Sequence, residues 1–172
     1  MHAPSPVSVR GLRFRTVALS DNRTLEMFAK MLHEHSWPPG YPVSAIDEVH
    51  DAEFIVCAYA VDADNPVGFM SVNRYASPDG IDNVNCMWLA GLVLLPEYRS
   101  MEIMFRLYRW CLDFLKVGSD RILTCTEKPV IERYLKFSGW RKVRQTYVRG
   151  RIPTVVYELD KRFACNLAVA LR

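Results

Sequence analysis

The sequence lacks both a long hydrophobic run and a strong charge of either sign. No apolar stretch in its 172 residues reaches the roughly 18 residues that a membrane-spanning helix requires. Residues 1–15 carry no apolar segment of the secretory type, so we expect a cytoplasmic protein without membrane association. The 22 basic and 19 acidic residues leave a formal charge of +3, which is too small to favour nucleic acid as a partner.

Paired cysteines are also missing. The five cysteines form no C-x-x-C motif, their number is odd, and most of them lie within apolar stretches. This pattern indicates reduced thiols in the core of a cytoplasmic protein. His33 and His35 are two residues apart and therefore point to different faces of a helix, so we expect no metal site.

What the sequence does have is the composition of an ordinary globular domain. Half of its residues are hydrophobic and 24% are charged, and the chain is long enough for a full-sized core. We expect one domain over residues 1–172, with a folded core at about 12–160. The mildly apolar tail, 161–172, packs either on the domain or on a second copy of the chain, as in a homodimer.

Hydrophobic periodicity and breaker residues predict the element order β-α-α-β-β-β-α-β-α-β-β. Ser20 or Asp21 is expected to cap the first helix, and Ser44 the second. A strand–helix–strand crossover links parallel strands, so we expect one parallel pair at the centre of an otherwise antiparallel sheet. The predicted strands are 12–19, 54–61, 67–75, 84–95, 121–126, 140–148 and 153–160, and the longer helices begin near 21, 101 and 129.

Three segments resemble a known family. The segment WLAGLVLLPEYR (88–99) resembles the central strand and the start of the coenzyme A loop of the GNAT acyltransferase superfamily. The segment YLKFSGW (134–140) resembles that family's tyrosine-containing helix, and YVRGRIPTVVYELD (147–160) resembles its final hairpin. The resemblance covers roughly residues 12–160 and implies an α/β (α+β) fold. That fold has a mixed, mostly antiparallel sheet with a central splayed parallel pair, flanked by helices.

The resemblance also implies an acyl donor and a place for it. Acetyl-CoA or another acyl-CoA would lie along the splayed central strand. Its pyrophosphate would bind backbone N–H groups at the start of the next helix. The acceptor would be the amine of a small molecule or a peptide. The implied donor-binding residues are Leu92, Val93, Leu94, Arg99, Ser100, Met101, Glu102, Ile103 and Met104.

Two residues are candidates for catalysis. Tyr134 is the candidate acid that protonates the leaving thiolate. Four residues, rather than the family's three, separate Tyr134 from Gly139, and one extra residue turns a helix by about 100°. A core tyrosine is therefore an equal alternative. Glu127 is a candidate base for the amine, and its alternative role is to cap the helix that begins at Pro129.

Two aromatic residues, Trp37 and Tyr41, lie in a proline-rich loop between the first two predicted helices. In the family this region borders the acceptor, so both are candidate substrate-binding residues. The alternative is that their rings only fill space between the helices.

The expected phosphate loop departs from the family's pattern. Glu102 and Met104 stand where the family has glycines, which let the backbone approach the phosphates. Glu102 either repels the donor or begins the polar face of its helix, where it pairs with Arg106. That polar face comprises Glu102, Arg106, Arg109, Asp113 and Lys116.

Three functions remain open from the sequence. The first is acetyl-CoA-dependent N-acetyl transfer. The second is N-acyl synthesis from acyl carrier protein, whose single phosphate needs no glycine loop and whose acidic surface would suit basic residues. The third is a non-catalytic GNAT-like binding or regulatory module. The basic residues near the last hairpin, which otherwise form a solvated strand face, are Arg141, Lys142, Arg144, Arg149 and Arg151.

Overall fold

The computed structural model describes residues 11–61, 64–76, 78–115 and 121–159. The tail 161–172, Cys165 and Lys116 therefore lie outside the described residues. Within the described part, no helix is both long and apolar enough to cross a membrane.

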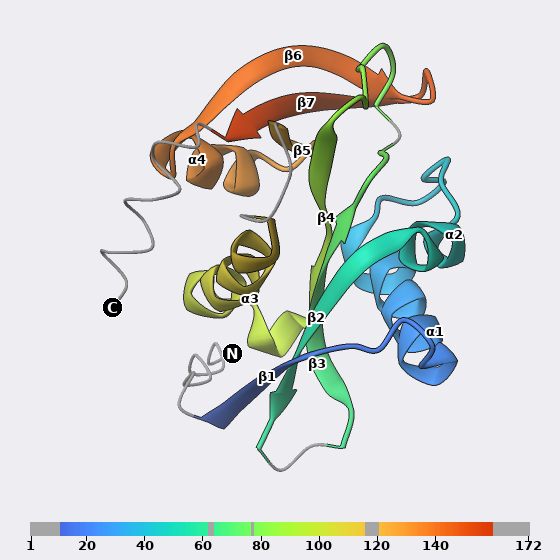
Figure 1. Ribbon diagram of the computed structural model, residues 1–172, viewed down its shortest axis with the longest axis vertical. Coiled ribbons are helices and arrows are strands. Elements are labelled where there is room, and N and C mark those ends of the chain that lie inside the picture. Colours follow the sequence, from blue (N-terminus) through green and yellow to red (C-terminus); the bar gives the residue numbers. More distant parts are fainter. Residues whose placement is uncertain (1–10, 62–63, 77, 116–120, 160–172) are drawn as a thin grey trace, which may run out of the picture.

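Seven strands form one twisted sheet in the order β1-β2-β3-β4-β5-β7-β6 (Figure 1). Helices α1 and α2 cover one side of the sheet, and α3 and α4 lie on the other side. The strands are β1 (Leu12–Thr16), β2 (Ala52–Ala60), β3 (Pro66–Asn73), β4 (Cys86–Leu94), β5 (Arg121–Thr126), β6 (Trp140–Val148) and β7 (Ile152–Leu159). The helical elements are α1 (Asn22–Met31), the π-helix η2 (Leu32–Ser36), α2 (Ala45–His50), the 3-10 helix η3 (Pro96–Tyr98), α3 (Met101–Leu115) and α4 (Pro129–Phe137).

The predicted helix starts are confirmed by their caps. The side chain of Asp21 accepts a hydrogen bond from the backbone N–H of Thr24, at 3.2 Å. Ser44 does the same for the N–H of Asp47, at 3.4 Å. Such caps satisfy N–H groups that a helix cannot satisfy internally, and each typically contributes about 1 kcal/mol. The two caps fix the residues at which α1 and α2 begin. They therefore also determine which side chains of each helix face the sheet.

The two faces of the central strands pack into two separate cores. On β2, Val56 and Ala58 face the core under α3 and α4, whereas Ile55 and Cys57 face the core under α1. Successive side chains of a strand point to opposite faces, so a strand covered on both sides needs an almost continuous apolar sequence. The four described cysteines are free, and all but Cys125 are buried.

The parallel pair predicted at the centre of the sheet is β4 and β5. Their register joins Cys86–Trp88 to Arg121–Leu123 and extends no further along these two fully described strands. Beyond that point the strands splay apart. The predicted mixed sheet, with one splayed parallel pair, is confirmed.

A bulge in β4 lies just beyond the point where the strands part. Phe69 pairs with Val93, but Ser71 pairs with Ala90, so β4 has an additional residue opposite β3. Gly91 adopts a φ of 56°, which favours glycine, and a Cβ there would lie 2.5 Å from the Oγ of Ser71. Glycine at this position therefore allows β4 to bend beside the gap.

Candidate active site

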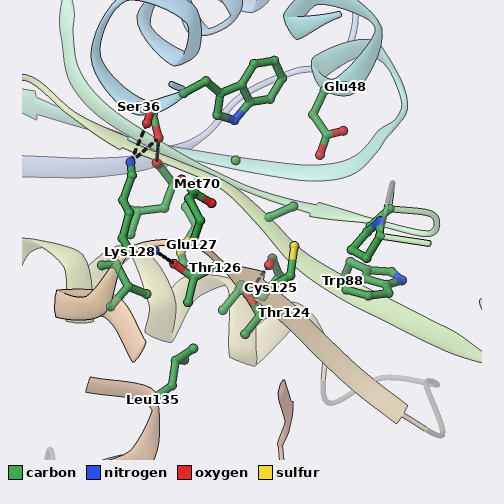
Figure 2. A pocket seen from close by; sticks show the side chains of 18 of the residues that line it. Ser36, Glu48, Met70, Trp88, Thr124, Cys125, Thr126, Glu127, Lys128 and Leu135 are labelled. Carbon is green, nitrogen blue, oxygen red and sulfur yellow. Dashed lines mark hydrogen bonds between the residues drawn. The ribbon is translucent and has the colours of Figure 1, made fainter. Parts of the chain in front are cut away.

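A cavity of about 170 Å³ opens where β4 and β5 separate (Figure 2). Residues from both sides of the sheet line it, so it extends through the gap between the two strands. From the side of α1 and α2 come Trp37, Tyr41 and Glu48, and from the side of α3 and α4 come Met104, Tyr108 and Tyr134. A cavity of this shape can hold two reactants that approach from opposite faces of the sheet.

Side chains, rather than backbone pairing, connect the two strands along the gap. The Thr124 hydroxyl donates to the carbonyl of Leu89 at 2.8 Å. Further along β4, the Ser36 hydroxyl donates to the carbonyl of Leu92 at 2.9 Å. The Lys128 ammonium donates to the carbonyl of Ser36 at 2.6 Å and to its hydroxyl at 3.2 Å. Figure 2 shows this bridge between η2 and the segment after β5.

The Lys128 ammonium is partly shielded from water at this bridge. Burial lowers its pKa, and the nearby Arg99 guanidinium lowers it further, whereas Glu127 acts in the opposite direction. Arg99 itself donates to the carbonyl of His35 at 2.7 Å and to that of Leu94 at 3.4 Å. Two cations therefore meet at this end of the gap, next to the first turn of α3.

The first turn of α3 leaves backbone donors unused. The N–H groups of Ile103 and Met104 bind the hydroxyl and the carbonyl of Ser100, each at 3.2 Å. The N–H groups of Ser100, Met101 and Glu102 have no such bond to any described residue. Unused N–H groups and the positive end of a helix favour an anion such as a phosphate.

The two residues that replace the family's glycines point in different directions. The Glu102 side chain is 66% exposed, and its carboxylate lies 4.0 Å from the guanidinium of Arg106, as expected for the polar face of α3. Met104 is buried and lines the cavity. The Glu102 carboxylate therefore points into solvent, while its backbone N–H stays at the helix start.

Tyr134 is buried on the α4 side of the cavity, with 8% of its surface exposed. Its ring lies edge-on to Phe105, with centroids 4.7 Å apart. Its hydroxyl has no hydrogen-bond partner among the described residues, and burial raises its pKa to about 12. A neutral hydroxyl without a partner is able to donate a proton to an anion formed in the cavity.

Three further predicted site residues, Glu127, Trp37 and Tyr41, also line this cavity. Glu127 is exposed at its rim. It does not cap α4, because the cap residue is Lys128, which makes no side-chain capping bond. That alternative role for Glu127 was wrong. Trp37 and Tyr41 stack loosely, with ring centroids 4.5 Å apart, and both line the cavity.

Sequence reasoning assigned no function to three residues that the fold brings to the cavity: Ser36, Glu48 and Lys128. Figure 2 shows Glu48 pointing from α2 into the cavity. Burial raises the pKa of its carboxyl group to about 7, with a smaller contribution from Asp51. No local motif marks these residues. The described residues contain no group of three or more His, Cys, Asp or Glu side chains that could hold a metal.

Comparison with known proteins agrees with this geometry. The acetyltransferase (GNAT) family model matches residues 22–140. No curated protein matches the sequence significantly.

Solved structures share the fold at low sequence identity. A protein described as a GNAT-family acetyltransferase from Desulfovibrio desulfuricans has 13% identity and a TM-score of 0.63, over 87% of this chain and 98% of that chain. A chain of the NatC complex, solved with Gag peptide and CoA, has 13% identity and a TM-score of 0.66, over 86% and 97%. Aminoglycoside 6'-acetyltransferase type Ii has 21% identity and a TM-score of 0.61, over 85% and 95%. The chain belongs to the GNAT family of acetyltransferases.

Proposed function

We propose that this protein is an N-acyltransferase that moves an acyl group from acyl-CoA, most simply acetyl-CoA, to an amine. One observation carries this proposal. The cavity at the β4–β5 gap joins an unpaired stretch of strand edge to a buried tyrosine hydroxyl that has no partner. Family membership supports acyl transfer in general, and this cavity is where the chain offers the groups that such a reaction needs.

The donor would lie along β4. Its pantetheine arm would bind the backbone of Leu92, Val93 and Leu94, as an added strand binds a sheet edge. It would displace the Ser36 hydroxyl from the carbonyl of Leu92. The phosphates would bind the first turn of α3, where the N–H groups of Ser100, Met101 and Glu102 are unused. Within this binding region, Arg99 fixes the loop, Ile103 supports its first turn, and Met104 forms a wall of the cavity.

A bound acyl thioester would supply the acyl group to the amine nitrogen. As the carbon–sulfur bond breaks, Tyr134 would donate its proton to the sulfur. The amine would lose one proton toward Glu127 at the rim, directly or through water. Glu127 would then release that proton to solvent and the Tyr134 oxygen would take one up, which restores both residues. Trp37 and Tyr41 would hold the body of the acceptor on the opposite side of the sheet.

The carrier-protein alternative depends on a free basic surface near the last hairpin. Several of those cations already bind the protein itself. Arg141 pairs with Glu158 at 3.2 Å, while Arg144 and Arg149 bind the carbonyls of Gly80 and Pro42 at 2.9 and 3.2 Å. These contacts favour a structural role for the cations, and they make acyl-CoA the better-supported donor.

Calorimetry with acetyl-CoA tests the proposal. We expect a binding heat that acyl carrier protein does not produce in a matched titration. Mass spectrometry of the purified protein should also detect bound CoA or acyl-CoA. If millimolar acetyl-CoA gave no heat while acyl carrier protein bound, the carrier-protein alternative would replace our proposal. If neither bound, a non-catalytic module would be the better description.

A further inference from the structure

Buried polar contacts fix the position of Glu48. Its backbone carbonyl accepts a hydrogen bond from the Asn73 amide of β3 at 2.8 Å. Asn73 is 1% exposed, and its amide oxygen accepts a bond from the Ser71 hydroxyl at 2.9 Å. Val49, the next residue of α2, is anchored in the core. The short helix is therefore held against the sheet at Glu48 and Val49, and the Glu48 carboxylate lies at the cavity wall.

The Glu48 carboxylate has no compensating partner in the cavity. No hydrogen bond or ion pair joins it to a described residue. The titratable groups that face it are Asp51 after its own helix, the Tyr41 hydroxyl and the Cys125 thiol of β5. None of the three is a cation, and Glu127 lies beyond them at the rim. An uncompensated carboxylate is costly to bury, which points to a positive charge supplied by a ligand.

The surroundings of Glu48 are mostly apolar and aromatic. Trp37, Tyr41, Val43 and Trp88 line the same cavity. Aromatic faces attract organic cations and also pack against flat apolar groups. Glu48 and Glu127 are the acidic residues among the described cavity lining, and only Glu48 projects from α2.

We infer that Glu48 receives the ammonium group of the acceptor, and that this acceptor is a compact monoamine with an apolar or aromatic body. The inference rests on the acyl transfer proposed above. One partly buried carboxylate matches one ammonium group, and the small, aromatic-lined cavity disfavours long polycations. Glu48 would take one proton from the bound ammonium. The resulting neutral amine could then attack the thioester, and Glu48 would release its proton to bulk water, because Glu127 takes the second proton that the amine loses during transfer.

Amine binding tests this inference without requiring turnover. We would titrate phenethylamine and spermidine separately into the wild type, Glu48→Gln and the control Asp47→Asn by calorimetry at about pH 8. Asp47 is exposed on the same helix, so the control removes one charge outside the cavity. We expect Glu48→Gln to weaken phenethylamine binding by about tenfold or more, and Asp47→Asn to leave it unchanged. The wild type should bind phenethylamine more tightly than spermidine.

A second measurement needs no substitution. Wild-type affinity for phenethylamine should fall between about pH 8 and pH 5.5, because the Glu48 carboxylate becomes protonated in that range. Undetectable phenethylamine binding, a preference for spermidine, or unchanged affinity in Glu48→Gln would overturn the inference. A parallel titration with acetyl-CoA separates the two proposals. Loss of donor binding alone contradicts the proposed function, and loss of amine binding alone contradicts the role of Glu48.

Discussion

At the scale of single residues, the cavity contains polar groups that stability alone would not select. The Tyr134 hydroxyl is buried without a partner, and the Glu48 carboxylate is shielded without a counter-charge. Leaving a buried polar group unpaired typically costs about 1–3 kcal/mol. Such unpaired groups therefore indicate a function. Removing either group should impair the proposed activity, while stability stays constant or rises.

Tyr134→Phe should lower turnover by about 10²–10⁴-fold, the range expected when a general acid is lost. Donor affinity should hardly change, since the ring remains. The free energy of unfolding should stay constant or rise, because the hydroxyl has no partner to lose. Steady-state kinetics and chemical denaturation measure the two effects. Unchanged turnover would assign Tyr134 to the core alone.

Tyr108→Phe provides a contrasting case in the same cavity. The Tyr108 hydroxyl accepts a hydrogen bond from the indole N–H of Trp140 at 2.9 Å. Removing it should lower the free energy of unfolding by about 1–2 kcal/mol, because the buried indole N–H would lose its partner. This loss should distinguish a paired tyrosine of the core from the unpaired Tyr134.

Glu48→Gln should make the protein more stable at high pH. The folded state raises the pKa of Glu48 from 4.5 to about 7, so it binds the proton more tightly than the unfolded chain. The stability of the wild type should therefore fall as pH rises through that window. Glutamine cannot ionise, so at about pH 8 the variant should be more stable by up to roughly 3 kcal/mol. Denaturation at about pH 8 and pH 4 measures this, and an equal difference at both pH values would contradict it.

At the scale of elements, the sequence predicted those structural features that depend on residues close together in the chain. The caps at Asp21 and Ser44 and the polar face of α3 follow from hydrogen-bond chemistry and helical periodicity. The π-helix η2 and the bulge at Gly91 were not predicted, because both depend on packing against β4 and β3. The first strand was expected to reach residue 19, but it ends at Thr16, where its pairing with β2 ends.

Glu102→Gly tests how the first turn of α3 works. The Glu102 carboxylate lies in solvent near Arg106, so acetyl-CoA affinity should hardly change at low or high salt. Stability should fall by about 1 kcal/mol, since glycine weakens a helix and the charge pair is lost. Calorimetry at two salt concentrations, together with denaturation, tests both parts. Tighter donor binding only at low salt would show that the carboxylate repels the phosphates.

At the scale of the whole molecule, the site is assembled from segments that are far apart in the sequence. Lys128 and Ser36 bind each other although 92 positions separate them. The sequence predicted the parallel strand pair, and with it the region of the site, because a crossover helix constrains topology. It did not reveal Glu48, Ser36 or Lys128 as cavity residues, because their neighbours are set by the packing of α2 and η2 on the sheet.

The same architecture predicts that donor and amine both bind before the acyl group is transferred. A cavity that extends through the sheet allows donor and amine to be bound together. Burial raises the pKa of the Cys125 thiol in this cavity to about 12, so it stays protonated near neutral pH and is a poor nucleophile. Direct transfer within a ternary complex is therefore expected, without an acyl-enzyme.

Initial rates of thiol release, with acetyl-CoA and phenethylamine both varied, test the central claim most directly. We predict amine-dependent release, with double-reciprocal lines that intersect because both substrates occupy the cavity before transfer. Parallel lines would indicate a covalent acyl-enzyme and contradict direct transfer. Thiol release that does not depend on phenethylamine would contradict the acceptor site built around Glu48, Trp37 and Tyr41.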